Sequence, residues 1–111
     1  MNRKAEDHTQ YLICKRPVSG AKATGYTIEK GFVVLKGSRV SSYLTPSFRK
    51  RKDKSYEIRM KLEKDGTIVD RIFQYDYVFN SPSQASSVIL GHISSGQADW
   101  KTESGTELHH I

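Results

Sequence analysis

The sequence predicts an α+β domain in which a small, mostly antiparallel sheet has two helices packed against it. Three observations support this fold class: short runs of strand-forming residues, a helical repeat over residues 55–64, and a capped helix over residues 81–91. The 111 residues, 36% hydrophobic and 27% charged, are typical of one folded globular domain. We expect this domain to span residues 11–101, with flexible tails at residues 1–10 and 102–111.

The first strands are predicted from β-branched and aromatic runs bounded by turn residues. Residues 11–15 form one such run, and residues 16–23 are predicted to be a loop because they contain proline and glycine. Residues 24–28 and 32–36 are separated by a three-residue connection that ends in glycine. Such a connection is typical of a hairpin.

The later strands are predicted around Asp70-Arg71 and along an aromatic segment. Ile68-Val69 and Ile72-Phe73 flank Asp70-Arg71 and resemble a second hairpin. In the segment that follows, rings recur at every second position, which predicts one strand with four rings on its core-facing side. These rings belong to Phe73, Tyr75, Tyr77 and Phe79.

Two helices are predicted, and the second has the clearer boundaries. Residues 55–64 carry side chains at spacings of three and four before Asp65-Gly66 ends the pattern. In the second helix, Ser81 is a suitable N-cap, Pro82 suits the first helical position, and Gly91 is a natural stop. A turn containing Gly96 follows this helix, and residues 98–101 are predicted to be a strand or a turn. Trp100, in that last segment, is assigned to the core rather than to base stacking.

The net charge of +6 is concentrated in the middle of the chain. Residues 36–64 contain ten Lys and Arg against three acids, whereas residues 65–111 contain two against six. The densest run is Arg49-Lys50-Arg51-Lys52-Asp53-Lys54, and other cations nearby in sequence are Lys36, Arg39, Arg59, Lys61 and Lys64.

This basic run indicates a phosphate-contacting face. Five cations in six positions repel one another and attract polyanions such as a phosphate backbone. Cations ahead of a helix also oppose its dipole, so the run is not expected to stabilise the helix that follows. A solvated loop and helix start is the alternative that the same residues allow. No aromatic residue interrupts the run, so stacking on single-stranded bases is not implied.

The sequence offers no catalytic constellation, and we expect neither an enzyme nor a metal or cofactor site. The serines lack a positioned general base, which a nucleophile requires. His8, His92, His109 and His110 do not form a pair at metal-ligand spacing in a segment predicted to be structured, so incidental or structural roles are expected for them.

The single cysteine and the lengths of the apolar runs indicate the cellular compartment in which we expect the protein. Cys14 excludes an internal disulfide framework, fits a reducing compartment, and is predicted to be a buried strand residue. No apolar run approaches the ~20 residues of a membrane helix. Residues 1–10 have no apolar stretch that could serve as a signal peptide. We therefore expect a cytoplasmic protein with no membrane partner.

Two long motifs resemble those of a small bacterial domain of unknown function. Residues 31–38 are similar to its GFVVLKGS motif, and residues 76–85 are similar to its D-Y-x-F-x-S-P-S-x-A pattern. Gly96 and Trp100-Lys101 match its closing N-G-x-x-x-W-K element. Ser86 stands where that family has a second alanine, and Ser95 where it has asparagine. The resemblance covers roughly residues 23–101.

This resemblance implies a functional context. The similar domain is often found C-terminal to GIY-YIG nuclease domains and beside restriction–modification components. The closing pattern also resembles the RAMA (restriction enzyme adenine methylase associated) domains, which are proposed to bind DNA. No segment of the 111 residues resembles a GIY-YIG nuclease itself.

The expected function is a non-catalytic DNA-binding or accessory module of nuclease or restriction–modification systems. The cations expected to contact phosphates are Arg49, Lys50, Arg51, Lys52 and Lys54. The residues expected to contribute finer recognition near the capped helix, whose N-terminus offers free N–H donors, are Ser38, Arg39, Ser81, Ser83 and Lys101. The alternative is a protein-interaction module that docks to a nuclease or methylase subunit without touching DNA.

Overall fold

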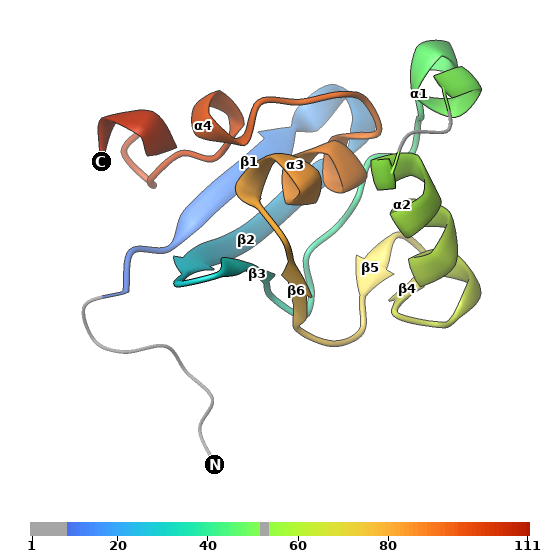
Figure 1. Ribbon diagram of the computed structural model, residues 1–111, viewed down its shortest axis with the longest axis horizontal. Helices are drawn as coiled ribbons and strands as arrows, with labels where there is room; N and C mark the ends of the chain where they lie inside the picture. Colours follow the sequence, from blue (N-terminus) through green and yellow to red (C-terminus); the bar gives the residue numbers. More distant parts are fainter. Residues whose placement is uncertain (1–8, 52–53) are drawn as a thin grey trace.

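A four-stranded antiparallel sheet with a helix across one face forms the body of the protein (Figure 1). The structure is a computed structural model that describes residues 9–51 and 54–111. The strand order is β1-β2-β3-β6, and β4 and β5 pair as a separate two-stranded sheet beside it. The predicted α+β class is therefore confirmed.

The elements follow one another with short connections. The strands are β1 (Leu12–Arg16), β2 (Ala21–Ile28), β3 (Gly31–Val34), β4 (Ile68–Val69), β5 (Ile72–Phe73) and β6 (Tyr77–Phe79). The α-helices are α1 (Pro46–Arg51), α2 (Lys54–Lys64), α3 (Pro82–Leu90) and α4 (Gly96–Asp99), and the 3-10 helices are η1 (Pro17–Ser19) and η2 (Leu108–His110). Within the described ranges, none of these helices has the length and apolar character needed to cross a membrane.

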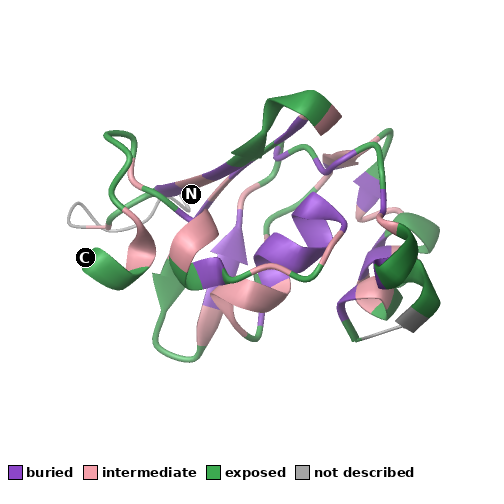
Figure 2. Ribbon diagram, turned by 90° about the horizontal axis from the view of Figure 1, so that it is seen from above, coloured by how far each residue is buried: buried purple, intermediate pink, exposed green. Residues whose placement is uncertain are grey.

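The capped helix α3 is buried around its circumference over its last six residues. Ser81 Oγ accepts a hydrogen bond from Gln84 N (3.1 Å), Pro82 opens the helix, and Gly91 closes it in the left-handed conformation at φ 77°. The predicted caps are confirmed. Residues 85–90 are six consecutive buried positions, more than one full turn, and Figure 2 shows them at the centre of the molecule. The helix packs on the sheet, and α2 and α4 flank it.

The only tryptophan joins α3, the sheet and the C-terminal segment. Trp100 is fully buried, and its ring lies 4.4 Å from that of Phe32 between centroids. Its Nε1 donates to Pro82 O in the first turn of α3 (3.0 Å). Gly96 N donates to Ser83 Oγ (2.8 Å) in the same turn. The core assignment of Trp100 is confirmed.

The predicted second hairpin forms through an unusual turn. Ile68 pairs with Phe73 and Val69 with Ile72, as expected. Asp70 and Arg71 between them both have positive φ (53° and 69°), the pattern of a type I′ turn. This conformation strains residues other than glycine. The Arg71 guanidinium offsets part of the cost by donating to Ser19 O (3.1 Å).

Residues 21–23, predicted to be part of a loop, begin strand β2 instead. Ala21 and Ala23 have low strand propensity, so they hid the alternation that the structure shows: Ala21, Ala23 and Gly25 are all buried. Both alanines share one core with Val88 and Ile89 of α3. Small side chains on β2 therefore let the buried helix lie close to the sheet.

The predicted aromatic strand over residues 73–79 was wrong as a single element. Phe73 belongs to β5, whereas Tyr77 and Phe79 belong to β6. The intervening Tyr75 is 65% exposed, and Asp76 Oδ1 accepts from Lys36 N (2.8 Å). Phe79 still contacts both Phe73 and Tyr77, at 6.3 and 4.7 Å between ring centroids. Three of the four rings thus meet, but they do so across two sheets.

Residues 102–111, predicted to be a flexible tail, fold back on the domain. Lys101 bridges Ile13 at the edge of β1 and also Glu107, and Thr102 N donates to Thr106 O (2.8 Å). Leu108 packs against the core. The polar composition of this segment concealed a compact turn held by backbone hydrogen bonds.

Replacing Gly96 with alanine is expected to destabilise the domain. A Cβ at this position would lie 2.4 Å from both the Pro82 carbonyl carbon and Ser83 N, so α4 would have to move off α3. We expect the free energy of unfolding to fall by about 1–3 kcal/mol, measured by urea denaturation with Trp100 fluorescence. The control is Gln97→Ala, an exposed position in the same helix, with an expected change within about 0.5 kcal/mol. Equal stability of the two variants would contradict the close packing.

Candidate nucleic-acid interface

The basic run lies at a helix-to-helix junction, where the sequence predicted no helix before residue 55. Thr45 Oγ1 accepts from Phe48 N (3.2 Å) as α1 begins at Pro46. Phe48 is fully buried and meets Tyr56 of α2 edge-to-face, 5.9 Å between ring centroids. This aromatic contact joins α1 to α2. The Thr45-Pro46 pair was the sequence signal for α1.

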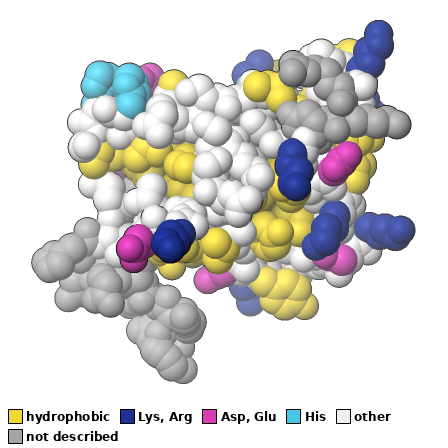
Figure 3. All heavy atoms as spheres, viewed as in Figure 1, with side chains coloured by type: hydrophobic (Ala, Val, Ile, Leu, Met, Phe, Trp, Pro, Cys, Tyr) yellow, Lys and Arg dark blue, Asp and Glu magenta, His cyan; other side chains and the backbone are white. Residues whose placement is uncertain are grey.

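Three cations of the run have exposed side chains. Arg49, Lys50 and Lys54 have exposed side chains, and none forms an ion pair within residues 9–51 and 54–111. Arg51 ends α1, and Lys52 lies outside the described residues. Figure 3 shows Lys and Arg side chains gathered over the α1–α2 end of this face. We call Arg49, Lys50 and Lys54 the basic junction.

The dipole argument made from the sequence holds for only one of these cations. Arg49 and Lys50 lie in the last turn of α1, where a positive charge is favourable. Lys54 begins α2, where a positive charge is unfavourable. The expectation that the whole run opposes a helix dipole was therefore wrong, because it assumed a single helix.

Arg59, a nearby cation in sequence, is a structural residue. Only 4% of it is exposed. Its Nε donates to Glu63 Oε2 (2.7 Å), Nη1 to Val88 O (3.0 Å) and Nη2 to Ser41 O (2.8 Å). The side chain therefore ties α2 to α3 and to the segment before α1, and it is not available to a ligand.

The three serines expected to assist recognition are engaged within the chain. Ser38 is buried, and its Oγ accepts from Thr24 N (3.1 Å). Ser81 caps α3, and Ser83 Oγ accepts from Gly96 N (2.8 Å). Their hydroxyl groups stabilise the fold, so the geometry does not support their use in base recognition.

Arg39 and Lys101 are exposed but lie on other parts of the surface. The backbone of Arg39 forms one isolated β-bridge with Lys22 of β2 and a second with Ile72 of β5. Lys101 follows α4 and bridges Ile13 of β1. Figure 1 places α4 far from α1 along the longest axis of the molecule, which measures 40 Å. The structure therefore does not bring Lys101 to the basic junction.

A cavity of about 300 Å³ lies beside β1, and Lys101 is the one residue of its lining that the sequence had singled out for recognition. Charges of both signs line it, among them Lys15, Arg16, Asp99 and Lys101. Cys14 of the same strand is buried, as predicted. Burial raises the pKa of the Cys14 thiol to about 12, and the Asp99 carboxylate adds to the rise. The thiol is therefore neutral at physiological pH and is not an activated nucleophile.

The comparisons with known proteins identify the family but not an activity. The model of the family described as Domain of unknown function (DUF4357) matches residues 12–111. The chain belongs to this family. The match includes residues 102–111, so the DUF4357 domain contains the folded-back segment that follows Trp100. No curated protein and no solved structure matches the chain.

The role of Arg59 in this DUF4357 domain can be tested by Arg59→Met, which keeps apolar bulk but removes every hydrogen bond. The variant leaves two carbonyls, Val88 O and Ser41 O, without their donor. We expect the free energy of unfolding to fall by about 2–4 kcal/mol in urea denaturation. Lys61→Met, on an exposed position of α2, is the matched control and should change stability by less than about 0.5 kcal/mol. An Arg59→Met variant as stable as the control would show that these bonds contribute little.

Proposed function

We propose that this domain is a non-catalytic DNA-binding or accessory module, and that the basic junction contacts the phosphate backbone. The observation that carries the proposal is the exposure of Arg49, Lys50 and Lys54 without acidic partners among the described residues. Clustered like charges repel one another, and a polyanion relieves that repulsion. Binding also releases counterions from the nucleic acid.

The contrast with other cations of the chain supports this assignment. Arg59 and Arg71 donate to backbone carbonyls, and Lys61 pairs with Asp65 at 3.5 Å. Arg59 and Arg71 therefore serve the fold, whereas the exposed Lys61–Asp65 pair adds little stability. Within the part of the chain that the structure describes, Arg49, Lys50 and Lys54 have no such partner, and they lie within six positions of one another, so their arrangement favours an external ligand.

Phosphate contacts position a protein on DNA but do not specify a sequence. The engaged hydroxyls of Ser38, Ser81 and Ser83 leave few candidates for base recognition. We therefore propose binding that depends on backbone charge more than on base identity. The resemblance to domains found beside GIY-YIG nucleases, restriction–modification components and RAMA domains supports a role beside a nuclease or methylase subunit.

The alternative, a docking module that does not touch DNA, is favoured by one feature. The sheet face opposite α3 carries a row of apolar side chains: Tyr26 pairs with Val33, and Val33 pairs with Val78. Val78 is 56% exposed, and Tyr11 meets the Tyr26 ring at 5.7 Å between centroids. Exposed apolar surface of this kind suits a protein partner. A nuclease or methylase subunit would be that partner.

Charge reversal at the basic junction should weaken DNA binding. We expect Arg49→Glu, Lys50→Glu and Lys54→Glu together to reduce affinity for duplex DNA by about tenfold or more at low salt. The slope of log K against log salt should become shallower by about 2–3, because up to three phosphate contacts are lost. Fluorescence anisotropy of a labelled duplex, titrated at several salt concentrations, measures both quantities.

A matched control separates position from net charge. Lys15→Glu, Lys30→Glu and Lys36→Glu change the net charge equally at exposed positions on other elements. This control should retain most of the affinity. Equal loss in both triple variants would show that net charge alone drives binding. No binding by the unaltered protein at low salt would favour the docking module, which pull-down with candidate subunits and a Val78→Glu variant would then test.

A further inference from the structure

The turn after Trp100 holds three potential metal ligands on a fixed backbone. The bridge between Lys101 and Glu107 secures one side of the turn. Leu108 N donates to Trp100 O (2.9 Å), and the Leu108 side chain packs against the core. The residues on either side of Leu108 are therefore held in place relative to the domain.

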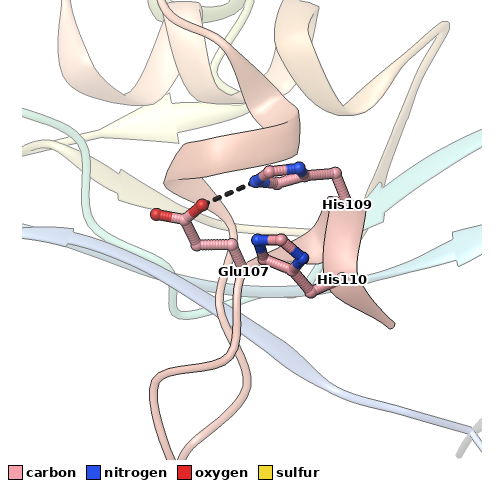
Figure 4. A group of neighbouring side chains, drawn as sticks. All are labelled: Glu107, His109 and His110. Atoms are coloured by element: carbon pink, nitrogen blue, oxygen red, sulfur yellow. Dashed lines mark hydrogen bonds and ion pairs between the residues drawn. The ribbon is translucent and has the colours of Figure 1, made fainter.

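The side chains of Glu107, His109 and His110 converge on the outside of this turn (Figure 4). One donor atom from each residue lies within 4.8 Å of the other two. His109 Nε2 is 2.6 Å from Glu107 Oε1, and the two imidazole rings are 4.0 Å apart between centroids. The hydrogen bond to His109 lowers the pKa of Glu107.

The contacts among Glu107, His109 and His110 contribute little to the stability of the fold. The side chains of His109 and Glu107 are 44% and 36% exposed, and an exposed pair of this kind adds little stability. Two neighbouring imidazoles beside one carboxylate do, however, supply the donor set that borderline divalent ions prefer.

We propose that Glu107, His109 and His110 form a binding site for a divalent transition metal ion of the Zn²⁺ class. Two imidazole nitrogens and one carboxylate oxygen supply three ligands, and solvent water completes the coordination because the site is exposed. Mg²⁺ and Ca²⁺ prefer all-oxygen sites and are not expected to bind here. The proposal is independent of DNA binding by the basic junction.

The required rearrangement is small. Ligands about 2.0–2.1 Å from a tetrahedral ion lie about 3.3 Å apart. The Glu107–His109 contact at 2.6 Å must widen slightly, and the longer separations, up to 4.8 Å, must close. Rotation about side-chain torsions accomplishes both, because the atoms face solvent.

A cation close to the site opposes the ion. Lys101 and Glu107 are partners in an antiparallel bridge, so their side chains extend from the same face of it. Removing that charge should favour a divalent ion at the same position. Lys101→Gln is therefore expected to tighten binding severalfold, a change that a structural role of the turn would not produce.

The test titrates Zn²⁺ into the full chain by isothermal calorimetry, with Co²⁺ absorption as a second readout of coordination. We expect one ion per chain and an affinity lower by about tenfold or more in His109→Ala/His110→Ala and in Glu107→Gln, since even outer partners of a metal contribute about that much. The control, His8→Ala/His92→Ala, removes the other two histidines and should bind as the unaltered protein does.

Thermal unfolding shows whether a variant that does not bind Zn²⁺ is still folded. Zn²⁺ should raise the melting temperature of the unaltered protein and the control but not that of the His109/His110 variant. Unchanged affinity in that variant, loss of binding in the control, or one ion per two chains would overturn the site.

Discussion

The burial of α3 on all sides over residues 85–90 is the constraint on which the rest of the structure depends. A helix enclosed on every side must approach its neighbours closely, and small residues at its centre, Ala85, Ser86 and Ser87, permit this. The polar atoms that burial brings inside are then satisfied by neighbours. Ser86 Oγ donates to Ser83 O, Ser87 Oγ accepts from Ser94 N, and Val88 O accepts from Arg59. The positions of α2 and of the turn after α3 thus follow from the need to partner one helix.

The same constraint divides the basic residues into two groups. The Arg59 side chain is buried, where its guanidinium donates to a buried carbonyl of α3. A guanidinium can donate to several acceptors at once, and Arg59 also donates to Ser41 O. Arg71 serves two carbonyls, Ser19 O and Val40 O, in a similar way. The cations of the basic junction lie on α1 and at the first residue of α2. Sequence position alone does not separate these groups, because both belong to one positively charged region.

The sequence could predict the elements whose signals are local. The caps of α3, the end of α2 and the β4–β5 hairpin depend on residues within a few positions of one another, and all three were predicted correctly. The start of β2 and the break at Tyr75 depend on packing with distant segments. Ala21 is a strand residue because α3 lies above it, and the hydrogen bond from Lys36 to Asp76 marks the break between β5 and β6. The sequence showed the basic junction as a run of Lys and Arg. It did not show that this run is divided between two helices.

The arrangement of charge in space differs from its arrangement along the chain. Asp65, although it follows the basic region, pairs with Lys61 of α2. Asp99, Glu103 and Glu107 instead lie around α4 and η2, far from α1 in Figure 1. The α1–α2 end therefore presents exposed cations, whereas the opposite end carries charges of both signs. Under the proposed function, this asymmetry would orient a nucleic acid toward α1 and α2 before contact, and salt would weaken the effect by screening it. At that mixed-charge end, attraction for a small cation comes from the three proposed ligands themselves, because Lys101 beside Glu107 opposes it.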